Sequence, residues 1–317
     1  MTDLGHVLVL AGGLSPERDV SLRSGHRVCD ALRENGVDAI TVDADSALIP
    51  AILADPPDAV FPAIHGVSGE DGAVRAVLGL LDVPFVGAIA SACRFAFDKP
   101  DAKTLAVAAG LRTPESITLP RETFHDLGAA AVLERIVARL GLPLFVKPSR
   151  GGSALGAGPV RTAAELPAAM VGCFAYGDTA LIERYVTGTE VAVGVIDLGD
   201  GPQALPAVEI VPDGGVYDYA ARYTAGRTEF YTPARISAAA AKAAADTAVT
   251  AHTSLGLRDI SRTDLIVDEA DTVFFLEVNV APGMTETSTL PMALAAAGHG
   301  FGTICHDLLV QAVQRGD

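Results

Sequence analysis

Four polar residues near the end of the chain are spaced for binding a metal ion and stabilising negative charge. Arg262 and Asp264 lie two residues apart in one run of alternating polar and apolar residues. Glu277 and Asn279 lie two apart in a second such run, after a turn-forming segment at 268–272. Alternation predicts a β-hairpin with each pair on one strand face, and oxygen ligands beside a fixed cation suit magnesium that holds phosphates. A solvated amphipathic hairpin with ordinary surface charges shows the same pattern, and periodicity alone favours that alternative.

A glycine-rich segment directly after a lysine is the second candidate for ligand binding. Lys147 lies in a strand-like run at 142–148, and the following segment, 149–158, contains Arg150 and four glycines. Small residues expose backbone N–H groups and the two basic side chains supply positive charge, so this segment suits phosphate. No Gly-Lys-Ser or Gly-Lys-Thr ends the segment, so it is not a Walker-type loop.

Three further turns contain glycines that permit sharp bends or a close approach to a ligand. A Gly-Gly pair after the first strand lacks the GxGxxG spacing and indicates a plain tight turn. Glu17 follows it where a helix begins, a favourable place for a negative charge. The loop at 65–72 contains His65 and Glu70, which are candidates for acid–base catalysis or for structural roles. Gly283 lies in a turn directly after the hairpin.

Composition narrows the class of protein. The chain has 317 residues, half of them apolar and a fifth charged, which is typical of a globular protein with two or three domains. The net charge of −16 argues against nucleic acid or an anionic membrane as a partner. No apolar run reaches the roughly 20 residues of a membrane span, and no basic leader precedes the first strand. The four cysteines form no CxxC pair, so we expect buried thiols and a cytoplasmic protein.

The first third of the chain alternates strands with helices, which predicts an α/β region with a parallel sheet and ligands near the carboxyl ends of its strands. The runs at 180–185, 190–195 and 204–211 are expected to share one antiparallel sheet. Aromatic and arginine residues without periodicity predict a long functional loop at 217–231. The other predicted strands are 7–10, 37–42, 59–64, 83–87, 142–148, 261–267 and 273–279, and the predicted helices are 20–32, 73–81, 98–108 and 235–255.

Taken together, these segments resemble the D-alanine–D-alanine ligases of the ATP-grasp superfamily. The resemblance extends in order over nearly the whole chain, in the motifs GGLSPERDVSL, IHGVSGEDG, DK at 98–99, VKPSRGGSALG, IERYVTGTE, YDYAARY, RTD and LEVNVAPGMTETS. It implies an α/β fold, in part α+β, with ATP held between the last two of three domains. These are an N-terminal parallel-sheet domain at 1–97, a small central domain at 98–182 and a C-terminal antiparallel-sheet domain at 183–317. It also implies a homodimer.

The resemblance further implies an ATP-dependent ligase that joins two D-alanines through an acyl phosphate for peptidoglycan synthesis. Lys99 and Lys147 match lysines that bind ATP phosphates, and Glu190 matches the residue that holds the ribose hydroxyls. The linker that reads adenine corresponds to Glu183–Val186, and Arg222 stands where the family usually has lysine. The implied nucleotide site therefore consists of Lys99, Lys147, Glu183, Arg184, Val186, Glu190 and Arg222. Two magnesium ions, or manganese, would be held by Asp264, Glu277 and Asn279.

The substrate residues are implied in the same way. Glu17 matches the acid that binds the first D-alanine's ammonium group, and Ser288 matches the serine near the second D-alanine's carboxylate. Ser153 and Tyr223 match a pair that connects the central loop to the later one. The oxyanion donors, which a tetrahedral intermediate needs in place before it forms, correspond to Arg262 and the Gly283 amide.

Three departures from the family pattern concern substrate details. Ala154 replaces a serine, Arg222 replaces a lysine and Thr289 replaces a leucine, and the last change puts the shape of the second-substrate pocket in question. One alternative is therefore a relative that joins D-alanine to D-lactate or D-serine, or a copy kept for antibiotic self-resistance, although Tyr223 favours an amide product. The others are a catalytically silent nucleotide-binding module, which would be expected to lack a metal ligand or Arg262, and a nicotinamide dehydrogenase, whose fingerprint is absent.

Overall fold

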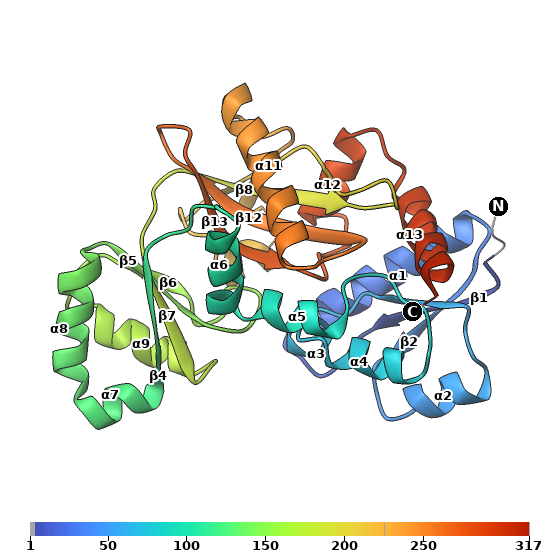
Figure 1. The fold of residues 1–317 in the computed structure, drawn as a ribbon, viewed down its shortest axis with the longest axis horizontal. Coiled ribbons are helices and arrows are strands. Elements are labelled where there is room, and N and C mark those ends of the chain that lie inside the picture. Colours follow the sequence, from blue (N-terminus) through green and yellow to red (C-terminus); the bar gives the residue numbers. More distant parts are fainter. Residues whose placement is uncertain (1–3, 225, 317) are drawn as a thin grey trace.

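The molecule consists of three regions placed side by side along its long axis (Figure 1). The structure is a computed structural model, and it describes residues 4–224 and 226–316. Each region is built on one β-sheet, and the sheets are parallel in the first region and antiparallel in the other two. Both chain ends lie in or beside the first region (Figure 1).

The N-terminal region is a parallel three-stranded sheet in the order β2-β1-β3, covered by helices on both faces. Strand β1 is almost entirely apolar and buried, as expected for the central strand of a covered parallel sheet. Its strands are β1 (His6–Ala11), β2 (Asp38–Asp43) and β3 (Ala59–Pro62). Its helices are α1 (Arg18–Glu34), α2 (Leu48–Ala54), α3 (Val67–Glu70), α4 (Ala73–Leu80) and α5 (Ala90–Phe97).

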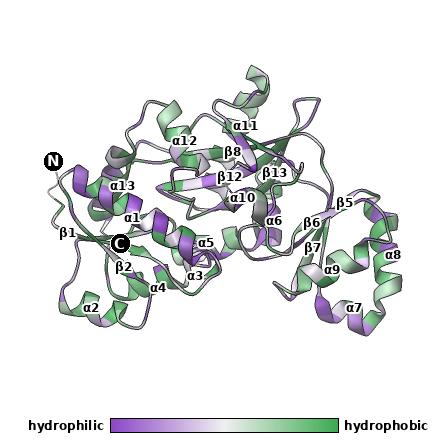
Figure 2. Cartoon of the chain, turned by 180° about the vertical axis from the view of Figure 1, so that it is seen from behind, coloured by the Kyte–Doolittle hydropathy of each residue, from purple (hydrophilic) through white to green (hydrophobic). Residues whose placement is uncertain are grey.

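Helix α1 is amphipathic, and Figure 2 shows hydrophilic and hydrophobic residues alternating along it. Val28 and Leu32 are fully buried against the sheet, while Gly25 lets the helix approach it closely. A Cβ atom at Gly25 would meet the side chain of Ala11 on β1. The helix begins directly after Glu17, whose carboxylate is thereby placed at the end of the sheet where β1 ends.

The central region is an antiparallel sheet in the order β4-β7-β5-β6, packed against α8 and α9. Its elements are β4 (Ser116–Pro120), α7 (Arg121–Leu127), α8 (Ala129–Leu140), β5 (Leu144–Pro148), β6 (Gly158–Val160), α9 (Leu166–Phe174) and β7 (Thr179–Arg184). Helix α6 (Lys99–Ala108) precedes them and begins at Asp98, whose side chain accepts a hydrogen bond from the Asp101 amide. Its Ala102 and Ala106 pack with the C-terminal sheet.

The C-terminal region is a six-stranded antiparallel sheet in which β12 lies between β8 and β13. Alanine-rich α11 packs on one face of it, because small residues at 240, 244, 248 and 251 let the helix approach closely. Its strands are β8 (Thr189–Ile196), β9 (Gln203–Ala204), β10 (Val208–Pro212), β11 (Thr228–Tyr231), β12 (Ile260–Val267) and β13 (Val273–Asn279). Its helices are α10 (Tyr219–Tyr223), α11 (Ala238–Ser254), α12 (Thr289–Ala296) and α13 (Phe301–Arg315).

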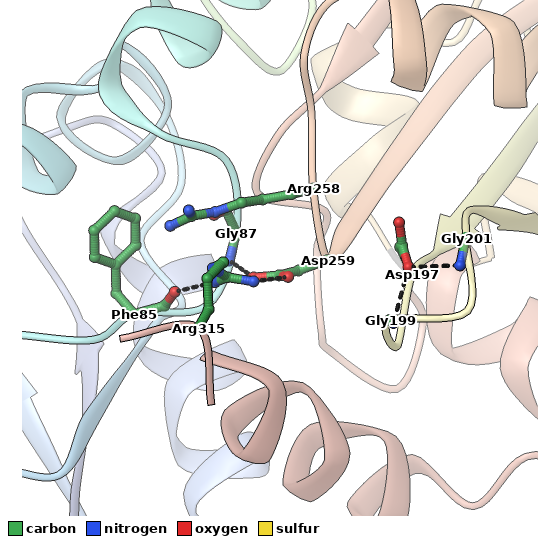
Figure 3. Close-up of polar contacts among 8 residues, drawn as sticks. All are labelled: Phe85, Gly87, Asp197, Gly199, Gly201, Arg258, Asp259 and Arg315. Carbon is green, nitrogen blue, oxygen red and sulfur yellow. Dashed lines mark hydrogen bonds and ion pairs between the residues drawn. The ribbon is translucent and has the colours of Figure 1, made fainter. Parts of the chain in front are cut away.

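The end of helix α13 is linked to the N-terminal region through the buried carboxylate of Asp259 (Figure 3). Arg315, the last residue of α13, donates from Nη1 and Nη2 to both oxygens of Asp259, at 2.7 and 3.0 Å. Asp259 also accepts from the Gly87 amide at 2.7 Å, and Arg315 donates to the Phe85 carbonyl at 3.1 Å. Asp259 directly precedes β12, so this cluster fixes the start of that strand against the N-terminal sheet. Arg258 adds a hydrogen bond of 2.7 Å to the Gly87 carbonyl.

Figure 3 also shows the side chain of Asp197, which closes the turn after β8 by accepting from the amides of Gly199 and Gly201. No helix in the part of the chain that the structure describes is long and apolar enough to cross a membrane. All four cysteines are free and buried, as predicted.

Most predicted elements are confirmed, including the hairpin at 261–279, but four expectations are wrong in detail. Strand β7 belongs to the central sheet, so 180–185, 190–195 and 204–211 do not share one sheet. The run 204–211 is divided into β9 and β10, because Pro206 lies between them and has no N–H to donate. The run 83–87 makes a single bridge from Phe85 to Val60 rather than a strand. The segment 217–231 is not an irregular loop throughout, since it contains α10 and β11.

Candidate functional site

A cleft lies between the central sheet and the C-terminal sheet. It has an empty volume of about 1000 Å³, which includes space open to solvent. Strands of both sheets, the start of α6 and the glycine-rich segment 150–157 supply its walls. Nine of the ten predicted nucleotide and metal residues line it, and Asn279 does not. The nine are Lys99, Lys147, Glu183, Arg184, Val186, Glu190, Arg222, Asp264 and Glu277.

One buried carboxylate holds a lysine of the cleft wall and a second lysine behind it. Glu183 on β7 forms an ion pair with Lys147 on β5 at 2.9 Å and a second ion pair with Lys103 on α6. Burial alone would raise the pKa of Glu183, but Lys147 and Lys103 outweigh it and lower that pKa. The carboxylate is therefore ionised and fixes the direction of Lys147. Lys103 also donates to the Pro114 carbonyl at 3.0 Å.

Lys99 connects the glycine-rich segment to the hairpin. Its Nζ donates to the Gly151 carbonyl at 2.8 Å and lies 3.4 Å from Glu277 on β13. Burial would raise the pKa of Glu277, but Lys99 and Lys147 lead a group of cations that lower it to about 2. Arg150 does not extend this cationic group, because Asp98 pairs with it at 2.8 Å. The cleft thus presents two lysines and an ionised carboxylate at one end.

A second cavity, with an empty volume of about 1330 Å³, adjoins the cleft, and Gly152, Tyr217 and Arg222 line both. The Arg222 guanidinium lies 4.2 Å from the centre of the Tyr217 ring, at this boundary. The predicted substrate residues on its walls are Glu17, Ser153, Arg262, Gly283 and Ser288, and the predicted metal ligand Asn279 lines it as well. Tyr223 was predicted to join them, but its side chain lies outside the part of the chain that the structure describes.

Glycines on two loops make room for the Glu17 carboxylate. A Cβ atom at Gly66 would lie 2.9 Å from Glu17 Cδ and 2.7 Å from Ser15 Oγ. A Cβ atom at Gly152 would lie 3.0 Å from Glu17 Oε1. Gly66 also has φ 76°, so glycine there lets the loop after β3 come close to Glu17, whereas a Cβ atom at Gly152 would require the Glu17 carboxylate to shift slightly.

Arg262 and Asp264 form a buried two-pronged ion pair along one face of β12. Nε and Nη2 of Arg262 donate to the two oxygens of Asp264, each at 2.7 Å. Burial would lower the pKa of Arg262, but Asp264 outweighs it and raises that pKa. Nη1 makes no hydrogen bond within residues 4–224 and 226–316, and the side chain lines the second cavity. A fixed cation with a free N–H is the arrangement that stabilises a developing oxyanion.

His65 holds the turn after β13 and is not available as a base. Its Nδ1 lies 3.0 Å from the Ala281 carbonyl, which only accepts, so Nδ1 carries the proton. Nε2 then accepts from the Ser24 hydroxyl at 2.8 Å. Burial lowers the pKa of His65 to about 4, which keeps the ring neutral. Of the two alternatives that the sequence left open for His65, the structure supports the structural one.

Two other carboxyl groups have pKa values near neutrality. Glu70 lines the second cavity and accepts from the Gly66 amide at 2.7 Å, and burial raises its pKa to about 7. Glu190 lines the cleft, and burial likewise raises its pKa to about 7. A carboxyl group with a pKa near the working pH is suited to exchange a proton, so Glu70 stays a candidate for acid–base work.

The predicted metal ligands fit a hard cation only as a partial set. Asp264 and Glu277 are direct partners across β12 and β13, and Asn279 pairs with Arg262 two residues away. No group of three or more His, Cys, Asp or Glu side chains gathers as a metal site in the described ranges. Two carboxylates and one amide oxygen match the preference of magnesium, which keeps several water or phosphate ligands. The donor set therefore fits magnesium bound together with a polyphosphate.

Sequence reasoning missed two residues that shape the site, Lys103 and Arg27, and gave only part of the position of a third, Arg222. Lys103 was recognised only as a helix position, although its spacing of four from Lys99 places both on one face of α6. Arg222 was assigned to the nucleotide alone, but it borders both cavities. Arg27 on α1 contacts the turn after β13, and nothing in the local sequence indicates this contact.

A cleft with two lysines between two antiparallel sheets, joined to a cavity with a fixed arginine, is the arrangement that the resemblance to ATP-grasp enzymes implies. A family model described as D-ala D-ala ligase C-terminus matches residues 105–310. The D-alanine--D-alanine ligase of Anaeromyxobacter sp. (strain K) is 38% identical over 303 residues, which cover 96% of this chain and 95% of the relative. That of Nitrosospira multiformis is 40% identical over 299 residues, covering 94% of each. The chain belongs to the D-alanine–D-alanine ligase family.

Solved structures agree with this assignment. The VanG D-Ala:D-Ser ligase from Enterococcus faecalis matches with a TM-score of 0.83 and 29% identity, covering 98% of this chain and 99% of that one. The D-alanine--D-alanine ligase from Bacillus anthracis matches with a TM-score of 0.84 and 26% identity, covering 98% of both chains. The similarity therefore includes all three regions of the fold.

Proposed function

We propose that this protein joins two D-alanine molecules in an ATP-dependent reaction that supplies D-alanyl-D-alanine for peptidoglycan. The observation that carries the proposal is the junction of the two cavities at Gly152, Tyr217 and Arg222. A nucleotide in the cleft would present its terminal phosphate to an amino acid in the second cavity. Full-length similarity to curated D-alanine--D-alanine ligases supports the substrate assignment.

The cleft residues would first transfer a phosphoryl group to the first D-alanine's carboxylate. Lys99 and Lys147 would spread the phosphate charge, with Lys147 held by Glu183. Glu183, Arg184 and Val186 would contact adenine, and Glu190 the ribose. Each oxygen of the Glu183 carboxylate accepts from only one lysine, so each keeps a lone pair that could accept a hydrogen bond from adenine.

The second-cavity residues would then complete the amide bond. Glu17 would bind the ammonium group of the first D-alanine, and Ser288 the carboxylate of the second. The second amine would attack the acyl phosphate, and the tetrahedral oxyanion would be stabilised by Arg262 and the Gly283 amide. Ser153 and Tyr223 would connect the two loops that exclude water from the acyl phosphate.

Magnesium, as two ions or replaced by manganese, would be held by Asp264, Glu277 and Asn279. When bound it would supply positive charge beside the transferring phosphate. The ionised state of Glu277, whose pKa is about 2, suits this role. Glu277→Gln should abolish turnover without unfolding the protein. Retained turnover would mean that the hairpin carries only surface charge.

The deciding assay measures phosphate release from ATP with D-alanine or L-alanine as the sole amino acid, and identifies the product when D-alanine is mixed with D-serine or with D-lactate. Release with D-alanine alone is the expected result. Equal release with both alanine enantiomers would overturn the substrate assignment while leaving the nucleotide site intact. A preference for D-serine or D-lactate as second substrate would instead support the alternative for which Thr289, on the wall of the second cavity, gives a reason.

The assembly and the domains are proposed on the same family basis. We infer a homodimer with domains at 1–97, 98–182 and 183–317. The four free, buried cysteines support a reducing, cytoplasmic location. Sedimentation of the purified protein would test the dimer, and a monomeric result at working concentration would exclude it. The net charge of −16 supports small-molecule partners rather than nucleic acid or an anionic membrane.

A further inference from the structure

The turn after β13 carries the Gly283 amide, which is assigned to the oxyanion, and Ser288, which is assigned to the second D-alanine, and it is packed tightly around Gly283. A Cβ atom at Gly283 would lie 2.6 Å from Ser288 Oγ, so the backbone there approaches the serine hydroxyl directly. Ser288 Oγ also accepts from the Thr285 amide at 3.1 Å and contacts Thr285 Oγ1 at 2.8 Å. The positions of the Gly283 amide and the Ser288 hydroxyl are thus fixed to each other through residues 283–288.

Helix α1 holds this turn from about 260 residues away in the sequence. Arg27 donates from Nη1 to two successive carbonyls, Met284 at 2.7 Å and Thr285 at 2.9 Å. Its guanidinium lies 4.3 Å from the centre of the Phe301 ring on α13, which fixes the plane of the group. Charged donors bind carbonyls more strongly than neutral ones, so the two Arg27 hydrogen bonds are a strong link between α1 and the turn.

A second contact, three residues earlier on the same face of α1, reinforces the first. Ser24 accepts from the Met284 amide at 3.2 Å and donates to His65, which in turn donates to the Ala281 carbonyl. Ser24 is fully buried and His65 nearly so. Side chains that α1 supplies or orients therefore form hydrogen bonds with the backbone of Ala281, Met284 and Thr285.

We propose that Arg27 is a positioning residue for the second substrate, and that α1 sets the separation between the two substrate subsites. The helix begins directly after Glu17, the proposed ligand of the first D-alanine, and ten residues later Arg27 fixes the turn with Gly283 and Ser288. A rigid helix therefore joins the two subsites. This inference rests on the proposed assignment of Ser288 to the second D-alanine and of the Gly283 amide to the oxyanion.

The test replaces Arg27 with leucine, which keeps the apolar contact with Phe301 and removes both hydrogen bonds. Initial rates over a wide range of D-alanine concentrations, fitted to a two-site rate law, separate the two substrate constants. We expect the KM of the second site to rise about 10-fold, equivalent to about 1.4 kcal/mol. The KM for ATP and that for the first D-alanine should stay unchanged. Equal changes in all three constants, or no change, would overturn the proposal.

Two further variants guard against a general structural effect. Arg27→Lys keeps the charge and one donor group, and should recover part of the second-site KM. Arg33→Leu on the same helix removes a similar arginine-to-carbonyl bond, to Ala39 on β2 at 2.8 Å, and should leave all three constants unchanged. If Arg33→Leu also raises the second-site KM, the effect belongs to α1 stability and the proposal fails.

Ser288→Ala separates this inference from the assignment on which it rests. A raised second-site KM for Ser288→Ala with an unchanged one for Arg27→Leu would reject the role of Arg27 alone. No effect of Ser288→Ala on the second-site KM would reject the assignment of the subsite itself. Both variants raising the second-site KM is the result that the geometry predicts.

Discussion

Gly66→Ala tests whether the loop after β3 must come as close to Glu17 as the structure shows. Gly66 has φ 76° and ψ −165°, a region essentially restricted to glycine, where other residues pay about 1–3 kcal/mol of backbone strain. The new Cβ atom would also lie 2.9 Å from Glu17 Cδ, against about 3.5–4.0 Å for an ordinary carbon contact. The carboxylate must therefore move by roughly 1 Å, or the loop must withdraw by as much.

A displacement of that size in a substrate-positioning group can cost about 100-fold in rate, or about 2.7 kcal/mol. We expect kcat/KM for the first D-alanine to fall by about that factor, while the KM for ATP changes little. Gly79→Ala is the matched control, because Gly79 lies in α4 with no atom within 4 Å of its would-be Cβ. It should be neutral or stabilising by about 0.5–1 kcal/mol. An active Gly66→Ala with an unchanged substrate constant would refute the steric argument.

Three stability predictions follow from buried polar groups. Burial raises the pKa of Glu70 to about 7, so the folded state binds an extra proton between about pH 4.5 and 7 and loses stability as pH rises. The free energy of unfolding of Glu70→Gln, measured by urea denaturation, should therefore rise relative to that of the wild type by up to about 3 kcal/mol from pH 5 to pH 8. A difference that does not change with pH would contradict this. Thr289→Val removes a buried hydroxyl with no partner among the described residues and should add about 1 kcal/mol, whereas a loss would reveal an unseen partner. Arg315→Leu strips the buried Asp259 of its cation and should cost about 3 kcal/mol by the same measurement, with an unchanged midpoint showing the pair to be unimportant.

The local pattern of the sequence was sufficient to predict features that depend on a single helix, strand or turn. Alternating polarity predicted the β12–β13 hairpin and placed Arg262 with Asp264 on one face, because side chains alternate across a strand. The glycine-rich segment after Lys147 and the carboxylate at the start of α1 were also readable, since turn glycines and helix starts have local signals. The motifs in order then specified the family, which the comparisons confirm.

Local sequence patterns did not predict the contacts between distant segments. Strand β7 reads like β8 in the sequence, yet it pairs with β4 and β5 in another sheet, because pairing is decided by which apolar faces are buried together. The ion pairs of Glu183 with Lys103 and Lys147 join residues up to 80 positions apart.

Two other contacts also join residues that are far apart in the sequence. Arg27 donates to the Met284 and Thr285 carbonyls, and Arg315 pairs with Asp259. Each of these side chains is an ordinary charged residue in its own neighbourhood. Local sequence patterns were enough to identify the family, many of the helices and strands, and the residues proposed to bind nucleotide and substrate in the two cavities. Which charges are buried and therefore fixed depends on the fold, because desolvation and pairing are set by neighbours from distant parts of the chain.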